Sequence, residues 1–204
     1  MQRRPWLLAA LALGARPAFA ATNARTDRSS PRRLTLRHEA TGARFSGPYH
    51  NGAAPDPVAL AELSIVLADH HSGVVHAFDP AALDVLWQVT RRAGLRGESA
   101  ILSGYRTPAT NAMVDGAGDS QHLRAAAMDV MLPTAGIPGF VEAALALGLG
   151  GVGSYPRRGF VHLDSGPPRH WGEAALAARP AARHDPLARM AEAWAATRGR
   201  LPAP

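Results

Sequence analysis

The most informative segment of the chain reads Ser120-Gln121-His122-Leu123-Arg124-Ala125-Ala126-Ala127-Met128-Asp129. The apolar residues 126–132 predict a strand, so Asp129 lies inside an apolar run, seven residues after His122. Burial of a bare carboxylate in such a run is costly unless the carboxylate has a partner, and a metal ion is one such partner. The alternative is structural: a capping histidine and an aspartate in a salt bridge.

A second cluster follows about thirty residues later, in Phe160-Val161-His162-Leu163-Asp164. Alternate side chains of a strand share a face, so His162 and Asp164 are expected to point the same way, with Phe160 beside them. Two imidazoles and one carboxylate form a common catalytic zinc set, which leaves the fourth coordination position for water. The two clusters together therefore indicate a zinc site.

Around these clusters the hydrophobic patterns predict an α+β fold with a small antiparallel sheet and helices packed on it. Two helices come first and most strands follow them, joined by short loops rather than by regular β-helix-β crossovers. Asp79-Pro80 supplies an N-cap and a first helical position for the second helix. The predicted elements are a hairpin over 34–45, helices over 57–68, 79–93 and 138–147, and strands over 100–102, 126–132, 150–155 and 160–164.

The chain ends differ from this body. Residues 1–20 predict an export signal, because Arg3 and Arg4 precede a short apolar stretch and Ala18-Phe19-Ala20 offers a cleavage site. The paired arginines fit a twin-arginine signal or an ordinary secretory signal, and an uncleaved anchor is a third alternative. We expect a linker over 21–33, one folded domain over 34–173 that carries the zinc site, and an Ala/Arg/Pro-rich tail over 174–204.

Composition narrows the function classes. The 204 residues contain no cysteine, which excludes disulfides and cysteine-based metal sites, and all 22 basic residues are arginine. Removal of Arg3, Arg4 and Arg16 with the signal would lower the formal net charge from +6 to +3. That modest charge, without a basic stripe interleaved with aromatic residues, argues against nucleic acid as a partner.

Several ordered motifs resemble one family. The segment from Ser120 to Asp129 is similar to the S-x-H-x-x-G-x-A-x-D signature of zinc D-Ala-D-Ala carboxypeptidases and related murein endopeptidases, which share the Hedgehog-like (LAS) fold. The exported MepK-type branch is the nearer match over residues 33–171. The matching motifs are Leu67-Ala68-Asp69-His70, Ser103-Gly104-Tyr105-Arg106-Thr107-Pro108, Gly150-Gly151-Val152-Gly153-x-Tyr155, Phe160-Val161-His162-Leu163-Asp164-x-Gly166 and Arg169-x-Trp171.

This resemblance implies that His122, Asp129 and His162 bind Zn²⁺ and that Arg106 pairs with a substrate carboxylate or stabilises an oxyanion. We assign Ser120, Tyr105, His170 and Trp171 to substrate binding. One departure from the signature is Ala125, which stands where the family has glycine. Alanine does not adopt a positive φ cheaply, so the ligand loop is expected to shift if the family needs that conformation.

The general base is the open point of this prediction. Relatives carry an acid or a histidine shortly before the last zinc ligand, but this chain has Gly159 and Phe160 there. We predict Asp164 as the base, with His170 as a further candidate. The alternative is that Asp164 orients a ligand histidine.

The resulting hypothesis is a monomeric periplasmic enzyme that hydrolyses peptide bonds of peptidoglycan with a zinc-activated water. It has no membrane partner once the signal is cleaved. The alternative is a non-catalytic cell-wall-binding module that retains a zinc site.

Overall fold

The computed structural model of the protein describes residues 30–173. The predicted signal peptide, most of the predicted linker and the predicted tail lie outside the described residues. The strands are β1 (Arg32–His38), β2 (Arg44–His50), β3 (Ser99–Ser103), β4 (Ala127–Met131), β5 (Gly151–Tyr155), β6 (Phe160–Asp164) and β7 (Arg169–Gly172). The helices are α1 (Pro57–Val66), α2 (Pro80–Arg92), α3 (Pro108–Met113) and α4 (Ile137–Leu147), with 3-10 turns η1 (Gln121–Arg124), η2 (Thr134–Gly136) and η3 (Pro156–Arg158).

Within the described part of the chain, the seven strands form one sheet in the order β2-β1-β3-β4-β6-β5-β7. The α+β class is confirmed, but the expectation of an antiparallel sheet is wrong because the sheet is mixed. β1 runs parallel to β3, because the chain reverses in β2 and again through α1 and α2 before β3. β7 runs parallel to β5, with the antiparallel β6 between them in sequence. The other neighbouring strands pair antiparallel.

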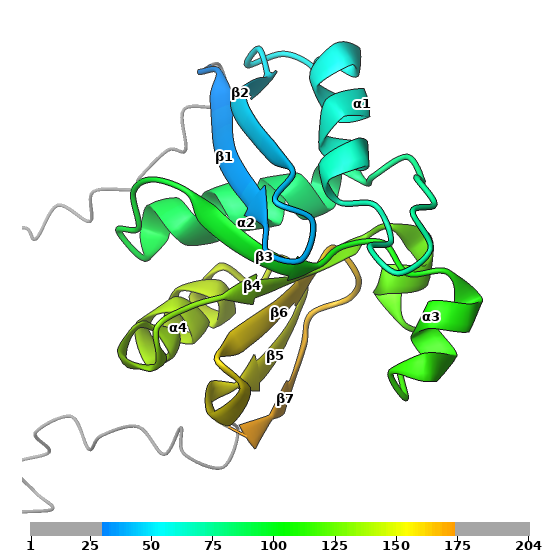
Figure 1. Ribbon diagram of the computed structural model, residues 1–204. Helices are drawn as coiled ribbons and strands as arrows, with labels where there is room; N and C mark the ends of the chain where they lie inside the picture. The colour runs from blue at the N-terminus through cyan, green and yellow to red at the C-terminus, as the bar shows by residue number, and fades with distance from the viewer. Residues whose placement is uncertain (1–29, 174–204) are drawn as a thin grey trace, which may run out of the picture.

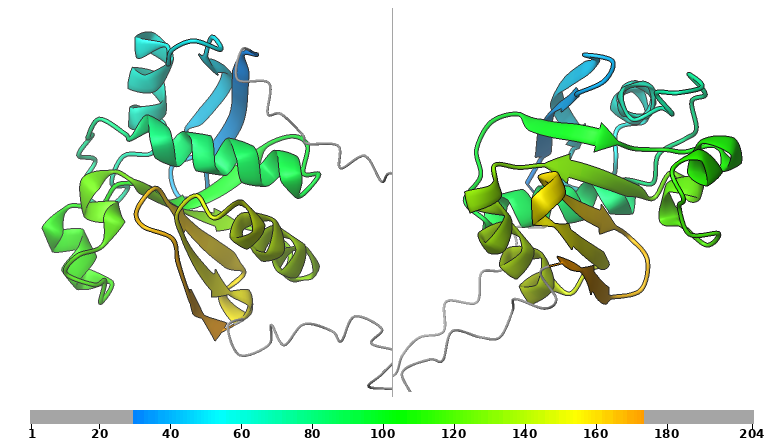
Figure 2. Two further views of the ribbon diagram at one scale, coloured as in Figure 1. Left: turned by 180° about the vertical axis from the view of Figure 1, so that it is seen from behind. Right: turned by 60° about the horizontal axis from the view of Figure 1, so that its bottom comes forward.

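Helices α2 and α4 cover one face of the sheet (Figures 1 and 2). Apolar side chains from alternate strand positions, such as Met128 and Leu163, are fully buried on this covered face. Asp129 and His162 occupy the intervening positions and therefore face the opposite side. The fold thus separates a hydrophobic core from a polar face on the same central strands.

Local sequence signals explain several elements. Asp79 caps α2, as predicted, and its carboxylate accepts a hydrogen bond from the Ala81 backbone N–H at 2.9 Å. The predicted hairpin is present as β1 and β2, and β1 already begins within the last residues of the predicted linker. The short helix α3 was not predicted, although Thr107-Pro108 carries the same cap-and-proline signal as Asp79-Pro80. Four-residue β7 was also missed.

Asp69 joins the loop after α1 to the start of α3. Its carboxylate accepts hydrogen bonds from the backbone and side chain of Thr107, both at 2.8 Å, and from the His71 backbone at 3.0 Å. Burial by itself raises the pKa of this carboxyl, but hydrogen bonds from Thr110, Thr107 and His71 hold the pKa well below its ordinary value. This connection fixes the segment that carries Arg106.

Replacement of Asp69 by asparagine is expected to lower the free energy of unfolding at pH 7 by about 2 kcal/mol, because an amide cannot accept all these hydrogen bonds. The folded-state pKa of Asp69 is lower than the unfolded one, so its stabilisation is present at neutral pH and declines as the pH falls below about 4. Denaturant unfolding at pH 7 and pH 3 should therefore show a smaller pH effect in Asp69→Asn than in wild type. Equal losses in both proteins would contradict this prediction.

Candidate active site

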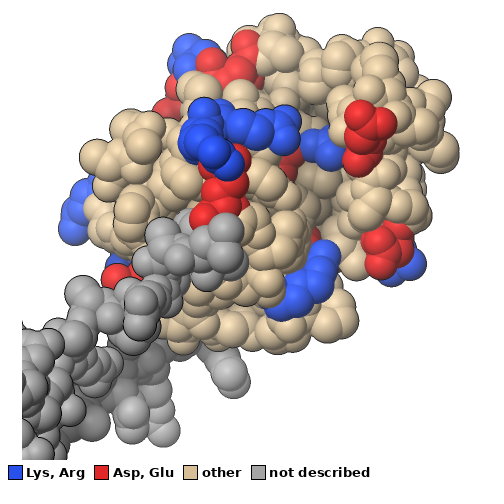
Figure 3. Space-filling view, turned by 90° about the horizontal axis from the view of Figure 1, so that it is seen from below, with Lys and Arg blue, Asp and Glu red and all other residues tan. Residues whose placement is uncertain are grey.

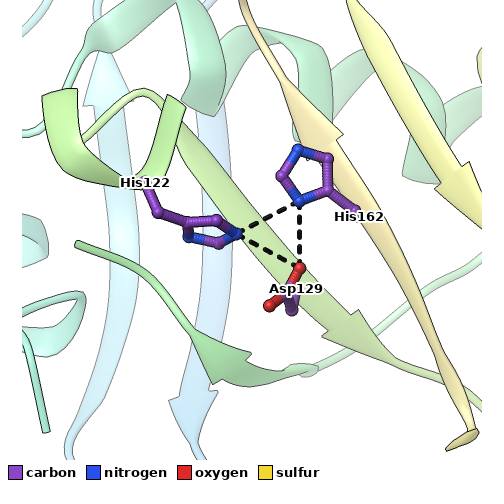
Figure 4. A group of neighbouring side chains, drawn as sticks. All are labelled: His122, Asp129 and His162. Atoms are coloured by element: carbon purple, nitrogen blue, oxygen red, sulfur yellow. Dashed lines mark hydrogen bonds and ion pairs between the residues drawn. The ribbon is translucent and has the colours of Figure 1, made fainter. Parts of the chain in front are cut away.

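Three side chains from different elements meet on the polar face of the sheet (Figure 4). His122 comes from η1, Asp129 from β4 and His162 from β6. The His162 Nδ1 atom lies 3.0 Å from Asp129 Oδ1 and 3.1 Å from His122 Nε2. The distance between Asp129 Oδ1 and His122 Nε2 is 3.3 Å. All three residues are buried. A cluster of donor atoms this compact can hold one metal ion.

Hydrogen bonds on the far sides of the two imidazoles determine which nitrogen faces the cluster. His122 Nδ1 lies 2.5 Å from the Gly104 carbonyl oxygen, and His162 Nε2 lies 2.9 Å from Asp164 Oδ2. Because both partners are acceptors, these nitrogens would carry the protons of the neutral rings when a metal ion is held on the other side. The lone pairs of His122 Nε2 and His162 Nδ1 are then directed at the cluster, as metal ligation requires.

The cluster belongs to a row of residues that crosses four strands. Asp129 pairs with His162, His162 with Gly153, and Gly153 with Trp171. A side chain at Gly153 would place its Cβ 2.8 Å from the indole of Trp171, so glycine lets the indole cross the strand. The Trp171 ring reaches within 5.2 Å of the His162 ring, and its Nε1 donates to the Tyr155 hydroxyl at 2.8 Å. The row therefore builds an aromatic wall beside the cluster.

Asp164 lies in the next row, behind His162. It is fully buried, and its two oxygens accept hydrogen bonds from Arg169 at 2.8 and 2.9 Å. The backbone N–H groups of Gly151 and Gly166 also donate to it, and a Cβ at Gly151 would overlap this ion pair. A general base needs an oxygen that faces the reacting water. The geometry therefore favours the alternative in which Asp164 orients His162 over the predicted role as base.

Opposite charges dominate the protonation of these groups. Burial raises the pKa of Asp129, but the neighbouring His122 and His162 hold the pKa well below its ordinary value. Burial likewise raises the pKa of Asp164, while hydrogen bonds from His162 and Arg169 lower it overall. Burial lowers the pKa of His162, and the two carboxylates raise it more. Both aspartates are therefore ionised at neutral pH.

Arg106 lies against the cluster from the side of β3. Its guanidinium donates to Asp129 Oδ2, the oxygen that does not face His162, and its Nε donates to the Ser103 hydroxyl at 2.8 Å. The Arg106 segment packs closely against Leu67. A Cβ at Gly104 would lie only 2.4 Å from the Leu67 carbonyl oxygen, so this approach requires glycine. Arg106 thus fixes the orientation of the Asp129 carboxylate and also lines the adjoining cavity.

This cavity has a volume of about 490 Å³ and contains the three-residue cluster in its wall. Among the predicted substrate-binding residues, Ser120 and Trp171 line it. Tyr105 does not, because its side chain is buried and lies 5.0 Å from the His76 ring. His170 does not either, since it alternates with Trp171 along β7 and therefore points to the other face.

Sequence reasoning missed several residues of the cavity wall. Tyr155, Arg158 and Phe160 line it, as does Arg169, the partner of Asp164. The sequence signal that could have revealed part of this wall is the alternation of residues along β5. Gly151, Gly153 and Tyr155 lie two residues apart, which indicates one strand face with room for larger side chains from its neighbours.

Ala125 ends η1 with φ 51° and ψ 35°, which is the left-handed conformation. This strained conformation is uncommon for alanine. The Ala125 carbonyl accepts a hydrogen bond from the Asp79 N–H at 2.9 Å, which helps to hold the turn. Alanine therefore takes the backbone conformation for which glycine is suited, and His122 still reaches Asp129.

Comparisons with known proteins agree with this architecture. A family model described as peptidoglycan L,D-endopeptidase MepK matches residues 26–171. The chain is 34% identical to peptidoglycan L,D-endopeptidase MepK of Escherichia coli strain K12 over 179 residues, which cover 83% of this chain and 96% of the relative. It is also 34% identical to the probable peptidoglycan L,D-endopeptidase MepK of Haemophilus influenzae, over 83% of this chain and 95% of the relative. The ordered motifs, the buried His-Asp-His cluster and these matches agree, and the chain belongs to the MepK family of M15-type metallopeptidases.

Proposed function

We propose that this peptidase hydrolyses amide bonds in the cross-link peptides of peptidoglycan and that it depends on zinc. The observation that carries the proposal is the cluster of His122, Asp129 and His162 in the wall of an open cavity. The relatives named as peptidoglycan L,D-endopeptidases support the substrate class. We also propose that the mixed sheet is a Hedgehog-like fold and that the protein is exported to the periplasm.

The donor set fits zinc. Two neutral imidazole nitrogens and one carboxylate oxygen are typical ligands of a catalytic zinc ion, and the acceptors on the far sides of both imidazoles match the tautomers that such ligation needs. A zinc ion held by these residues would supply Lewis-acid chemistry for the acidification of a water molecule and the polarisation of the amide carbonyl.

The residues around the cluster have separate tasks in this proposal. Arg106 orients Asp129 and offers its guanidinium to the negative charge that develops on the substrate oxygen. Asp164 and Arg169 hold His162 in place. Among the described residues that line the cavity, His70, His71, Asp115 and Asp119 are the remaining histidines and carboxylates, and the proton acceptor is assigned to this set.

The function is tested with the full-length protein, loaded with zinc, and purified cross-linked muropeptides. Chromatography with mass spectrometry should detect new peptide ends. A chelator should suppress them, and added zinc should restore them. Products that form equally in the chelator would contradict the metal-dependent mechanism. No products from the zinc-loaded protein, together with retention on sedimented sacculi, would support the non-catalytic cell-wall-binding module.

Within residues 30–173, no helix is both long and apolar enough to cross a membrane. The proposal of export instead depends on the signal predicted in residues 1–20 of the sequence.

A further inference from the structure

We propose that Arg158 binds a free carboxylate on the substrate residue next to the cleaved amide, and so selects peptides that carry this charge. This inference rests on the proposed function. Arg158 is the last residue of η3, the turn that joins β5 to β6, and it lines the same cavity as the His-Asp-His cluster.

An aromatic platform holds the Arg158 guanidinium at the cavity. The rings of Tyr155 and Phe160 stack with their centroids 4.7 Å apart. The guanidinium carbon of Arg158 lies 5.0 Å from the Phe160 centroid and 5.8 Å from that of Tyr155. A cation over an aromatic face is stabilised by the ring quadrupole while its N–H groups stay available at the edges. The charge is therefore positioned without using up its hydrogen-bond donors.

The other arginines of the cavity wall are already paired. Arg106 donates to Asp129, and Arg169 donates to both oxygens of Asp164. Arg158 has no carboxylate partner among residues 30–173, and its contacts there are the two aromatic rings. Arginine side chains form a row across the face shown in Figure 3, with acidic side chains next to it. Within the described cavity wall, Arg158 is thus the arginine free to pair with an incoming anion.

The register of the sheet sets how far this charge lies from the chemistry. Phe160, under Arg158, precedes His162 by two residues on β6, and both face the cavity side of the sheet. Two strand residues span about 7 Å. That distance is about two residues of an extended peptide backbone. The residue beside the cleaved amide covers it when its own length is extended by a side chain that ends in a carboxylate, so the anion expected at Arg158 is a side-chain carboxylate of that residue. A planar guanidinium matches a carboxylate with two parallel hydrogen bonds.

Arg157 provides a matched control. It is the neighbouring residue of the same turn and carries the same charge, but its side chain is 83% exposed and pairs with Glu173 at 3.1 Å. It does not line the cavity. A loss of general positive charge would affect Arg157→Ala and Arg158→Ala alike, whereas recognition of a carboxylate would affect only Arg158→Ala.

The experiment uses two synthetic cross-link peptides that differ at one group, a carboxylate or a carboxamide on the residue next to the cleaved bond. For the carboxylate peptide, Arg158→Ala should lower kcat/KM about tenfold or more, mainly through KM, because a charge-assisted bidentate contact is lost. For the carboxamide peptide the change should be small. Arg157→Ala should match wild type on both, and Arg158→Lys should recover part of the loss.

Equal losses of Arg158→Ala on both peptides would overturn the proposal and indicate a packing role of Arg158 on the aromatic platform. A loss confined to intact sacculi would also overturn it and point to the polymer as the anion. If wild type cleaves neither peptide, the proposed function fails separately. Calorimetric binding of the carboxylate peptide to the zinc-loaded protein then decides the Arg158 proposal, with weaker binding to Arg158→Ala expected and unchanged binding contradicting it.

Discussion

Replacement of Asp129 by alanine should reduce bound zinc from one ion per protein to an undetectable level and lower peptide cleavage by about 10³-fold or more. The substitution removes the carboxylate oxygen that lies between His122 and His162. Two imidazoles alone do not form a catalytic zinc site, and the metal contributes several kcal/mol to transition-state stabilisation. Metal analysis after dialysis and cleavage of cross-linked muropeptides measure the two effects.

Asp119→Ala is the control for this experiment. Asp119 is an exposed aspartate of the same cavity wall and lies outside the three-residue cluster. The Asp119→Ala variant should therefore retain one zinc ion per protein. Circular dichroism checks that both variants fold. A full complement of zinc in folded Asp129→Ala would show that the ligand assignment is wrong.

Replacement of Asp164 by asparagine should weaken zinc affinity about 10–100-fold, while the turnover number at saturating zinc stays within a few-fold of wild type. Asparagine has nearly the same shape as aspartate but is neutral, so both the bond to His162 and the pair with Arg169 lose strength. Loss of a partner that orients a ligand histidine typically costs that much in metal affinity. Zinc titration against a competing chelator and cleavage at saturating zinc separate the two quantities.

This experiment discriminates between the two roles considered for Asp164. If Asp164 were the general base, Asp164→Asn would keep its zinc and lose turnover at every zinc concentration. Arg169→Gln offers an independent check, because Arg169 contacts both oxygens of Asp164 from the cavity side. It should weaken zinc affinity in the same direction as Asp164→Asn, and by a smaller factor, since the carboxylate remains.

The sequence predicted those features that depend on local periodicity and capping. The Asp79-Pro80 signal correctly indicated the start of α2, and alternation on β6 correctly put His162 and Asp164 on one face. The same local rules were sufficient for α3, whose Thr107-Pro108 signal was overlooked. They were insufficient for β7, because four residues are too few to show a period.

By itself, then, the sequence determined the α+β class and the residue types of the candidate metal site, since strand alternation, helix caps and the donor chemistry of His and Asp are properties of short segments. Tertiary structure decided which strands run parallel, because that depends on how distant segments dock on the sheet. It also determined the contacts of Asp164, which favour an orienting role over that of a base. Strand pairing puts Arg169 of β7 beside Asp164 of β6 across Gly151, so the carboxylate is already occupied behind His162. Such a pairing joins residues on separate strands, and spacing along a single chain does not reveal it.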